Sequence, residues 1–367
     1  MTGGGNPFYE KIGFEACIGW TFWEKDFSHG KKTDIENKLR QDFRGAEIVV
    51  SEGEILFRRV TGYADLANRI PNTLETKFAS ASAGKVFVAV GILQLIEQGK
   101  LRFEDTLGNL LELDLHGIDP EVTVEQLLTH TSGVPDYFDE SVMEEYEELW
   151  VDYPNYKIRR NADLLPLFIH KEMMYPRGER FQYNNTGYVL LAMILEKVTG
   201  KAFDVYLRQH VFEACGMRDT GYYELDRLPA GCASNYIYDA AYGSYRTNIY
   251  SVDAKGTGAG GAFITLPDIV RFWEGLASGK LLSPDMVSRM LRRQSGDGLD
   301  SEEGYYGYGV WIIDGGDCDI PYFQGCDPGV SFLSEYHPRK KTITVLVSNY
   351  GDNVWEEMRR IRDTLYP

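Results

Sequence analysis

Ser82 and Lys85 are the first residues of this sequence whose types and spacing suggest chemistry. They lie three positions apart, at the start of a long apolar stretch that predicts a helix over residues 82–98. Residues i and i+3 share one face of a helix, so the Lys85 amine is expected beside the Ser82 hydroxyl. A serine hydroxyl needs a base to act as a nucleophile, and a partly desolvated lysine has a lowered pKa and accepts a proton. Taken alone, the pair is more simply explained as a helix-capping serine and a solvated lysine.

Two further segments could complete such a site. Tyr183 and Asn185 lie in a turn-rich stretch before a second apolar helix, predicted over residues 186–198. A phenol can relay a proton between a serine oxygen and a leaving group, and an asparagine can hold a substrate amide or the lysine. The simpler interpretation of this stretch is a buried, capped turn. His130, in a Leu-Leu-Thr-His-Thr-Ser-Gly segment, is predicted to form a structural hydrogen bond rather than to act as a base.

The composition limits the partners of the protein. The 367 residues are 43% hydrophobic and 25% charged, as in a globular protein, and the net charge of −17 argues against nucleic acid as a partner. A small molecule or a peptide remains as substrate. The sequence predicts no membrane span, because its apolar runs are too short, and it shows no secretory signal, so we expect a cytoplasmic protein. An exported form with a longer N-terminus stays open, and the oligomeric state is not predicted.

Metal and cofactor sites are not predicted either. The five cysteines are widely spaced and the six histidines form no ligand pattern, so we expect free thiols and no metal. Residues 256–261 match Gly-x-Gly-x-x-Gly, but a strand-like segment follows where a dinucleotide site needs a helix. We therefore expect catalysis without an organic cofactor.

The elements that must position these residues divide into strands at both ends of the sequence and helices in the middle. Strands are predicted over residues 46–51, 54–60, 310–313, 330–333 and 342–348. Helices are predicted around residues 35–43, 82–98, 123–129, 161–171, 186–198, 203–210, 268–277 and 355–365. This order predicts an antiparallel sheet closed by the two ends of the chain, with an inserted helical lobe.

Together these segments resemble the serine β-lactamase and penicillin-binding-protein superfamily, on its class C, esterase-type branch. The resemblance runs from about Ile35 to Asn349 and includes the Ser-x-x-Lys pair, the His130 segment, the Phe181-x-Tyr183-x-Asn185 turn, the stretch 259–268 and the strand 345–349. It implies an α/β fold of the α+β type, with terminal helices flanking the sheet. It also implies that Ser82 is the acylated nucleophile, that Lys85 and Tyr183 transfer its proton, and that Asn185 steadies the substrate.

The same resemblance predicts the domain organisation. Residues 1–33 are expected to be a loosely organised extension, and residues 34–367 a single catalytic domain. Its sheet lobe would take about residues 34–78 and 250–367, and its helical lobe about residues 79–249. The active site would lie in the cleft between the lobes.

The third motif of the superfamily is a Lys- or His-x-Gly on a strand, and here the sequence departs from it. Counting back from Pro328-Gly329 places Phe323-Gln324-Gly325 at this motif, so Phe323 replaces the cation. The N–H groups of Ser82 and Cys326 would then form the oxyanion hole. β-Lactams and D-Ala-D-Ala termini carry a carboxylate that an aromatic ring cannot pair with, so ester or uncharged amide hydrolysis is favoured.

Other functions stay open. The chain could be a penicillin-recognising D,D-peptidase or β-lactamase, with an arginine or lysine from a loop supplying the charge, or a non-catalytic relative that only binds a ligand. Residues 139–152 hold seven acidic and no basic residues. Such a run is usually a solvated helix face, but beside an active-site cleft it could attract cationic substrates such as amino-acid amides.

Overall fold

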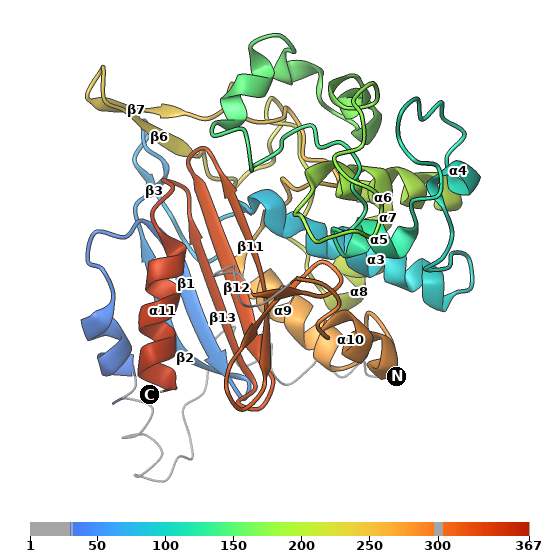
Figure 1. Ribbon diagram of the computed structural model, residues 1–367. Coiled ribbons are helices and arrows are strands. Elements are labelled where there is room, and N and C mark those ends of the chain that lie inside the picture. The colour runs from blue at the N-terminus through green and yellow to red at the C-terminus, as the bar shows by residue number, and fades with distance from the viewer. Residues whose placement is uncertain (1–29, 31, 297–303, 367) are drawn as a thin grey trace, which may run out of the picture.

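The centre of the protein is a seven-stranded antiparallel sheet, seen in a computed structural model that describes residues 30, 32–296 and 304–366 (Figure 1). Its strands lie in the order β2-β1-β13-β12-β11-β10-β9. Their bounds are β1 Gly45–Ser51, β2 Glu54–Thr61, β9 Tyr305–Tyr306, β10 Trp311–Asp314, β11 Asp319–Asp327, β12 Val330–His337 and β13 Thr342–Ser348. β1 pairs with β13 along its length, with Ile48 opposite Val345. The two ends of the chain therefore close the sheet, which confirms the predicted fold class.

Each face of the sheet carries a separate core. Side chains alternate along a strand, so Ile48 and Val50 of β1 face one core while Val49 faces the other. The first core continues into the buried helix α3 (Lys85–Glu97) and α9 (Leu266–Ala277). The second is covered by α11 (Val354–Leu365) and by the N-terminal helix at residues 32–38, which lie along the same face in Figure 1.

The middle of the sequence forms the helical part of the molecule. The further α-helices are α4 Leu107–Leu110, α5 Val124–Leu128, α6 Asn185–Thr199, α7 Phe203–Leu207, α8 Glu213–Cys215 and α10 Pro284–Met290. Short 3₁₀ segments are η1 Ala81–Gly84, η2 Tyr146–Trp150, η3 Asn155–Lys157 and η4 Asn161–Leu167, and η5 Arg208–Phe212 is π-helical. Three two-stranded sheets complete it: β3 Tyr63–Asp65 with β4 Ile70–Pro71, β5 Phe78–Ala79 with β8 Phe263–Ile264, and β6 Tyr236–Asp239 with β7 Ser244–Thr247.

Some element boundaries differ from the sequence predictions. The N-terminal helix ends at residue 38 rather than 43, and the helix predicted over residues 161–171 is a 3₁₀ segment that contains Pro166. β12 is longer than predicted, and β11 was not predicted from its residues, since Pro321 and Gly325 weaken a strand pattern. Most of the predicted extension over residues 1–33 lies outside the described residues, and the lobe boundaries stay a prediction.

Two expectations from the sequence, on membrane spans and on the cysteine thiols, can be compared with the described residues. None of their helices is long and apolar enough to cross a membrane. The four cysteines among them, Cys215, Cys232, Cys318 and Cys326, are free thiols.

A buried charge cluster joins the sheet to the terminal helix. Glu47 of β1 and Glu357 of α11 are both fully buried, and the Arg59 guanidinium from β2 pairs with both carboxylates. Burial raises the pKa of Glu47 to about 7, and the bonds from Arg59 oppose that shift. Arg59 is thus the cation that allows two carboxylates to be buried side by side.

We expect Arg59→Leu to lower the free energy of unfolding by about 3 kcal/mol, because it leaves two buried carboxylates without their counter-ion. Urea denaturation near neutral pH measures this effect. Arg58→Leu is the matched control, since Arg58 is exposed on the same strand and should change stability by less than about 0.5 kcal/mol. Equal stability of the two variants would contradict a stabilising role of the cluster.

Candidate active site

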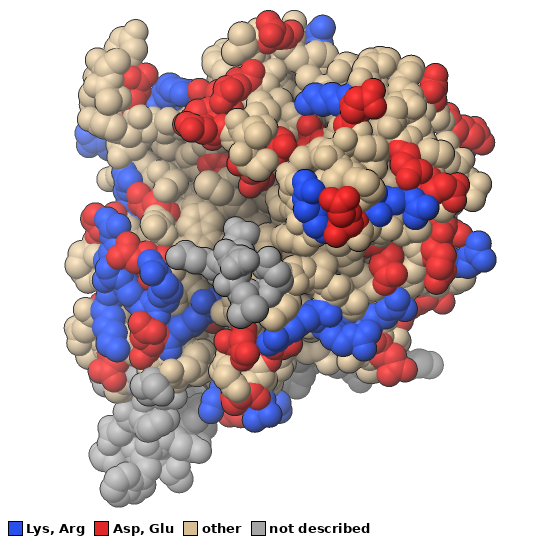
Figure 2. Space-filling model, viewed as in Figure 1, with Lys and Arg blue, Asp and Glu red and all other residues tan. Residues whose placement is uncertain are grey.

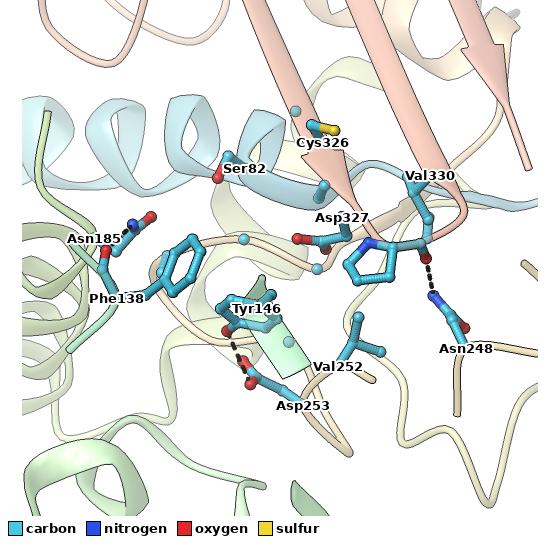
Figure 3. A pocket seen from close by; sticks show the side chains of 18 of the residues that line it. Ser82, Phe138, Tyr146, Asn185, Asn248, Val252, Asp253, Cys326, Asp327 and Val330 are labelled. Carbon is cyan, nitrogen blue, oxygen red and sulfur yellow. Dashed lines mark hydrogen bonds between the residues drawn. The ribbon is translucent and has the colours of Figure 1, made fainter. Parts of the chain in front are cut away.

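Ser82 and Lys85 lie at the junction between η1 and α3, at the edge of a large cavity. Ser82 is within η1 and Lys85 is the first residue of α3, so the single helix predicted from residue 82 begins as a 3₁₀ turn. The Lys85 Nζ donates a hydrogen bond to the Ser82 Oγ at 2.9 Å. Ser82 lines a cavity of about 830 Å³, and Figure 3 shows its hydroxyl at the cavity wall. The two groups therefore have the geometry of a nucleophile and its base.

The amine of Lys85 is buried, with 2% of the residue exposed. Besides Ser82 it donates to the Asn185 Oδ1 at 2.8 Å and to the Ala259 carbonyl at 2.6 Å. Burial lowers its pKa to about 8, while the negative charges of Glu140, Asp136 and Asp327 oppose the shift. A substantial fraction of Lys85 is thus neutral at mildly alkaline pH, and the lone pair of the neutral amine can accept the Ser82 proton.

Asn185 is the first residue of α6, and its side chain contacts the Lys85 amine. Its Nδ2 donates to the Phe138 carbonyl at 3.1 Å and to the Glu140 carboxylate at 3.3 Å. Both ends of the amide are therefore held within the protein, and the observed partner of Asn185 is Lys85. This is one of the two roles that the sequence left open for it.

Tyr183 lines the same cavity, two residues before Asn185. Its ring centroid lies 4.9 Å from the Lys85 Nζ, and the ring is stacked on Trp311 with centroids 5.7 Å apart. The His130 ring packs against Tyr183 at 4.5 Å. Two aromatic neighbours thus fix the position of the phenol beside the lysine.

His130 has the structural role that was predicted for it. Its residue is 1% exposed, and its Nδ1 accepts a hydrogen bond from the Asn184 backbone N–H at 3.0 Å. Burial holds its pKa well below the ordinary value, so the ring is neutral at physiological pH. His130 therefore anchors the turn that carries Tyr183 and Asn185.

Asp136 is a buried acid that the sequence analysis missed. Its carboxylate accepts from the backbone N–H groups of Asn185 at 2.8 Å and Thr186 at 3.0 Å, and from the Thr186 hydroxyl at 3.1 Å. These are unpaired donors at the start of α6, where a negative charge is stabilising. Asp136 is one acid among many in the sequence, and only its position in the fold shows that it orients Asn185 toward Lys85.

Strand β11 approaches the Ser82 turn most closely at Gly325. A Cβ at this position would lie 2.3 Å from the Ser80 carbonyl oxygen, 2.7 Å from the Ser82 nitrogen and 2.8 Å from the Ala83 nitrogen. Glycine is therefore required here. It lets the strand backbone lie against the turn, which brings Cys326 and the Ser82 N–H to the same cavity.

The predicted binding role of Phe323 is wrong. Phe323 is 2% exposed and does not line the cavity. Its ring packs on Trp273 at 5.2 Å and Phe272 at 5.8 Å, because this position of β11 faces helix α9. By contrast Gln324, Gly325 and Cys326 all line the cavity, and the Gln324 Oε1 accepts from the Trp355 Nε1 at 2.5 Å.

One group of potential metal ligands occurs among the described residues, away from the cavity. Asp317, Cys318 and His337 lie within 4.8 Å of one another at the ends of two hairpins. Asp317 pairs with Arg339 at 3.7 Å, and the Cys318 Sγ is 3.8 Å from the His337 Nδ1. Their wide separation in the sequence hid this group from a spacing search, and it takes no part in the site around Ser82.

The fold and the buried Ser-Lys pair define a serine hydrolase of the β-lactamase and penicillin-binding-protein class. The chain belongs to the Beta-lactamase family, whose model matches residues 28–362. It is 27% identical to penicillin-binding protein 4* of Bacillus subtilis (strain 168), over 87% of this chain and 71% of that protein.

Solved structures agree with this family. A penicillin-binding protein from Bacillus halodurans is 38% identical with a TM-score of 0.83, covering 92% of this chain and 99% of that chain. D-amino acid amidase from Ochrobactrum anthropi SV3 shares the fold at 22% identity, with a TM-score of 0.75 over 93% of this chain and 98% of that chain. The family prediction from the sequence motifs is thus confirmed.

We expect Gly325→Ala to lower kcat/KM for a p-nitrophenyl ester by about 100-fold, because the added methyl group forces β11 away from the Ser82 turn. Gly187→Ala is the matched control. Its Cβ would meet ordinary contacts of 3.6 Å or more on α6, so activity should stay within about threefold of wild type. Circular dichroism checks that both variants fold. A fully active Gly325→Ala protein would contradict the required close approach.

Proposed function

We propose that the protein hydrolyses esters or amides through an acyl-enzyme on Ser82. The contact between the buried Lys85 amine and the Ser82 hydroxyl carries this proposal. The neutral amine takes the Ser82 proton as the Oγ attacks the substrate carbonyl, and the carbonyl oxygen becomes an oxyanion. The backbone N–H groups of Ser82 and Cys326 stabilise that oxyanion.

The later steps need a proton donor and a water molecule. The Tyr183 phenol, beside Lys85, passes the proton to the leaving group as the tetrahedral intermediate collapses to the acyl-enzyme. Water then attacks the acyl carbon, its proton returns to the Lys85–Tyr183 pair, and Ser82 leaves with a proton. The steps use the side chains of Ser82, Lys85 and Tyr183 and the backbone N–H groups of Ser82 and Cys326, and none requires a metal or an organic cofactor.

The substrate is proposed to be an ester or an amide without a carboxylate near the reacting carbonyl. Phe323 supplies no cation to the cavity, and the cation among the cavity-lining residues, Arg246, is paired with Glu147 at 2.9 Å. A carboxylate such as that of penicillin therefore finds no free positive charge there. The penicillin-binding names of the relatives keep β-lactam acylation as the second candidate.

We expect wild-type protein to hydrolyse p-nitrophenyl acetate and Ser82→Ala to lose at least about 1,000-fold in kcat, because the nucleophile is removed. Ser244→Ala, an exposed serine of β7, should behave as wild type. Mass spectrometry of protein treated with penicillin tests the second candidate, since acylation adds the intact drug mass at Ser82. Equal ester turnover in wild type and Ser82→Ala would overturn the proposed nucleophile.

The pH dependence follows from the state of Lys85. Only the neutral amine accepts a proton, and burial lowers the amine pKa to about 8, so kcat/KM should rise about tenfold per pH unit below that value and level off above it. The rate is followed at the isosbestic wavelength of p-nitrophenol, after subtraction of spontaneous hydrolysis. Glu140→Gln removes a charge that raises the Lys85 pKa, so the midpoint should shift to lower pH. A profile that is flat from pH 6 to 9 would argue against Lys85 as the base.

A further inference from the structure

The cavity beside Ser82 is strongly acidic. Among its lining residues, the carboxylates are Glu140, Glu144, Glu145, Glu147, Asp253 and Asp327. The cation that lines it, Arg246, is already paired with Glu147. Figure 2 shows several acidic side chains above the hollow in this face of the molecule. The site therefore presents uncompensated negative charge to a substrate.

Asp327 is the carboxylate whose position bears most directly on the reaction. It is the last residue of β11 and directly follows Cys326, and Figure 3 shows its side chain pointing into the cavity. Within the described residues its carboxylate makes no hydrogen bond and no ion pair, although the side chain is only partly exposed. A desolvated carboxylate without a partner is unfavourable, and a bound cation would remove that cost.

The acidic groups near Asp327 add to the free-energy cost of its negative charge. Burial, together with the nearby charges of Asp253 and Glu140, raises the pKa of Asp327 to about 8, while the Lys85 amine opposes the shift, so a bound cation would favour the ionised carboxylate. Asp253 is also only partly exposed, and its carboxylate accepts a hydrogen bond from the Tyr146 hydroxyl at 3.1 Å. The Lys85 amine donates its hydrogen bonds to Ser82, Asn185 and Ala259, so it makes no direct ion pair with these acids.

The rest of the cavity wall suits an organic ammonium group. The rings of Phe138 and Tyr146 line it and pack edge to face, with centroids 4.9 Å apart. An ammonium group between carboxylates and aromatic rings gains both charge pairing and cation–π attraction. A carboxylate in the same place would be repelled by Asp327 and Asp253.

We propose that the cavity binds the protonated amine of an amino-acid amide or an amino-terminal peptide at Asp327 and Asp253, with the adjacent carbonyl held at Ser82. Asp327 directly follows Cys326, so this carboxylate and one donor of the proposed oxyanion hole come from consecutive residues of β11 that line the same cavity. This inference rests on the proposed role of Ser82 and adds the substrate class.

The test is competition against hydrolysis of the neutral ester p-nitrophenyl acetate, at about pH 7 and low salt. The two competitors are phenylalaninamide, with its enantiomers measured separately, and 3-phenylpropanamide, which lacks only the amine. In wild type we expect at least one enantiomer of phenylalaninamide to inhibit about tenfold more strongly than 3-phenylpropanamide. Asp327→Asn should bring the two inhibition constants to within about twofold of each other.

Matched controls make the result specific. Asp285→Asn makes the same charge change on the exposed first turn of α10, outside the cavity, and should keep the wild-type preference. Added salt should weaken inhibition by phenylalaninamide but not by its uncharged analogue, which tests the charge pairing in wild type even if Asp327→Asn does not fold. Asp253→Asn should reduce the preference as well.

The outcomes separate this inference from the proposed function. Ester hydrolysis that does not depend on Ser82 would remove the proposed function itself. Ser82-dependent hydrolysis with equal inhibition by both amides in wild type, or an undiminished preference in a folded Asp327→Asn protein, would overturn the amine site alone.

Discussion

The buried amine of Lys85 is the group on which the arrangement of the site depends. Its three acceptors come from three parts of the chain: Ser82 in η1, Asn185 at the start of α6 and the carbonyl of Ala259. A buried amine without hydrogen-bond partners costs several kcal/mol, so these segments must stay within bonding distance of one another. The same burial that imposes this requirement lowers the lysine pKa and makes the amine a base near neutral pH. Burial of the Lys85 amine thus accounts both for its hydrogen bonds to three segments and for its lowered pKa.

A second constraint is steric rather than electrostatic. β11 lies so close to the Ser82 turn that a Cβ at position 325 would overlap backbone atoms of the turn. This approach puts the end of the strand, with Cys326 and Asp327, at the wall of the catalytic cavity. The proposed oxyanion donor of Cys326 and the carboxylate of Asp327 that is proposed to bind an amine therefore come from consecutive residues of one strand.

Acidic side chains outnumber basic ones among the described residues that line the cavity. The position of the usual cation is taken by Phe323, whose ring belongs to the core beneath the strand rather than to the cavity. Acids from the segment 140–147, from Asp253 and from β11 line the cavity instead. This acidic lining supports the proposed preference for cationic substrates. The acidic run at residues 139–152 is part of this wall through Glu140, Glu144, Glu145 and Glu147, so it is more than a solvated helix face.

Local patterns in the sequence determined much of this protein. The order of strands and helices predicted the fold class, and the resemblance carried by the Ser-x-x-Lys pair, the Tyr183–Asn185 turn and the other motifs predicted the family and implied the proposed catalytic residues. These features are local, because helix periodicity and turn chemistry depend on neighbouring residues.

The tertiary structure alone decided the contacts between distant segments. The structure shows that the Phe323 ring packs against α9 and does not line the cavity. The face of β11 that α9 covers cannot be read from the residues of the strand itself. The tertiary structure also revealed Asp136 beneath α6, and it brought Asp253 and Asp327 together across 74 positions of sequence. No local sequence pattern encodes contacts between distant residues. Such contacts form only when the chain packs, and packing also excludes water from the groups that meet.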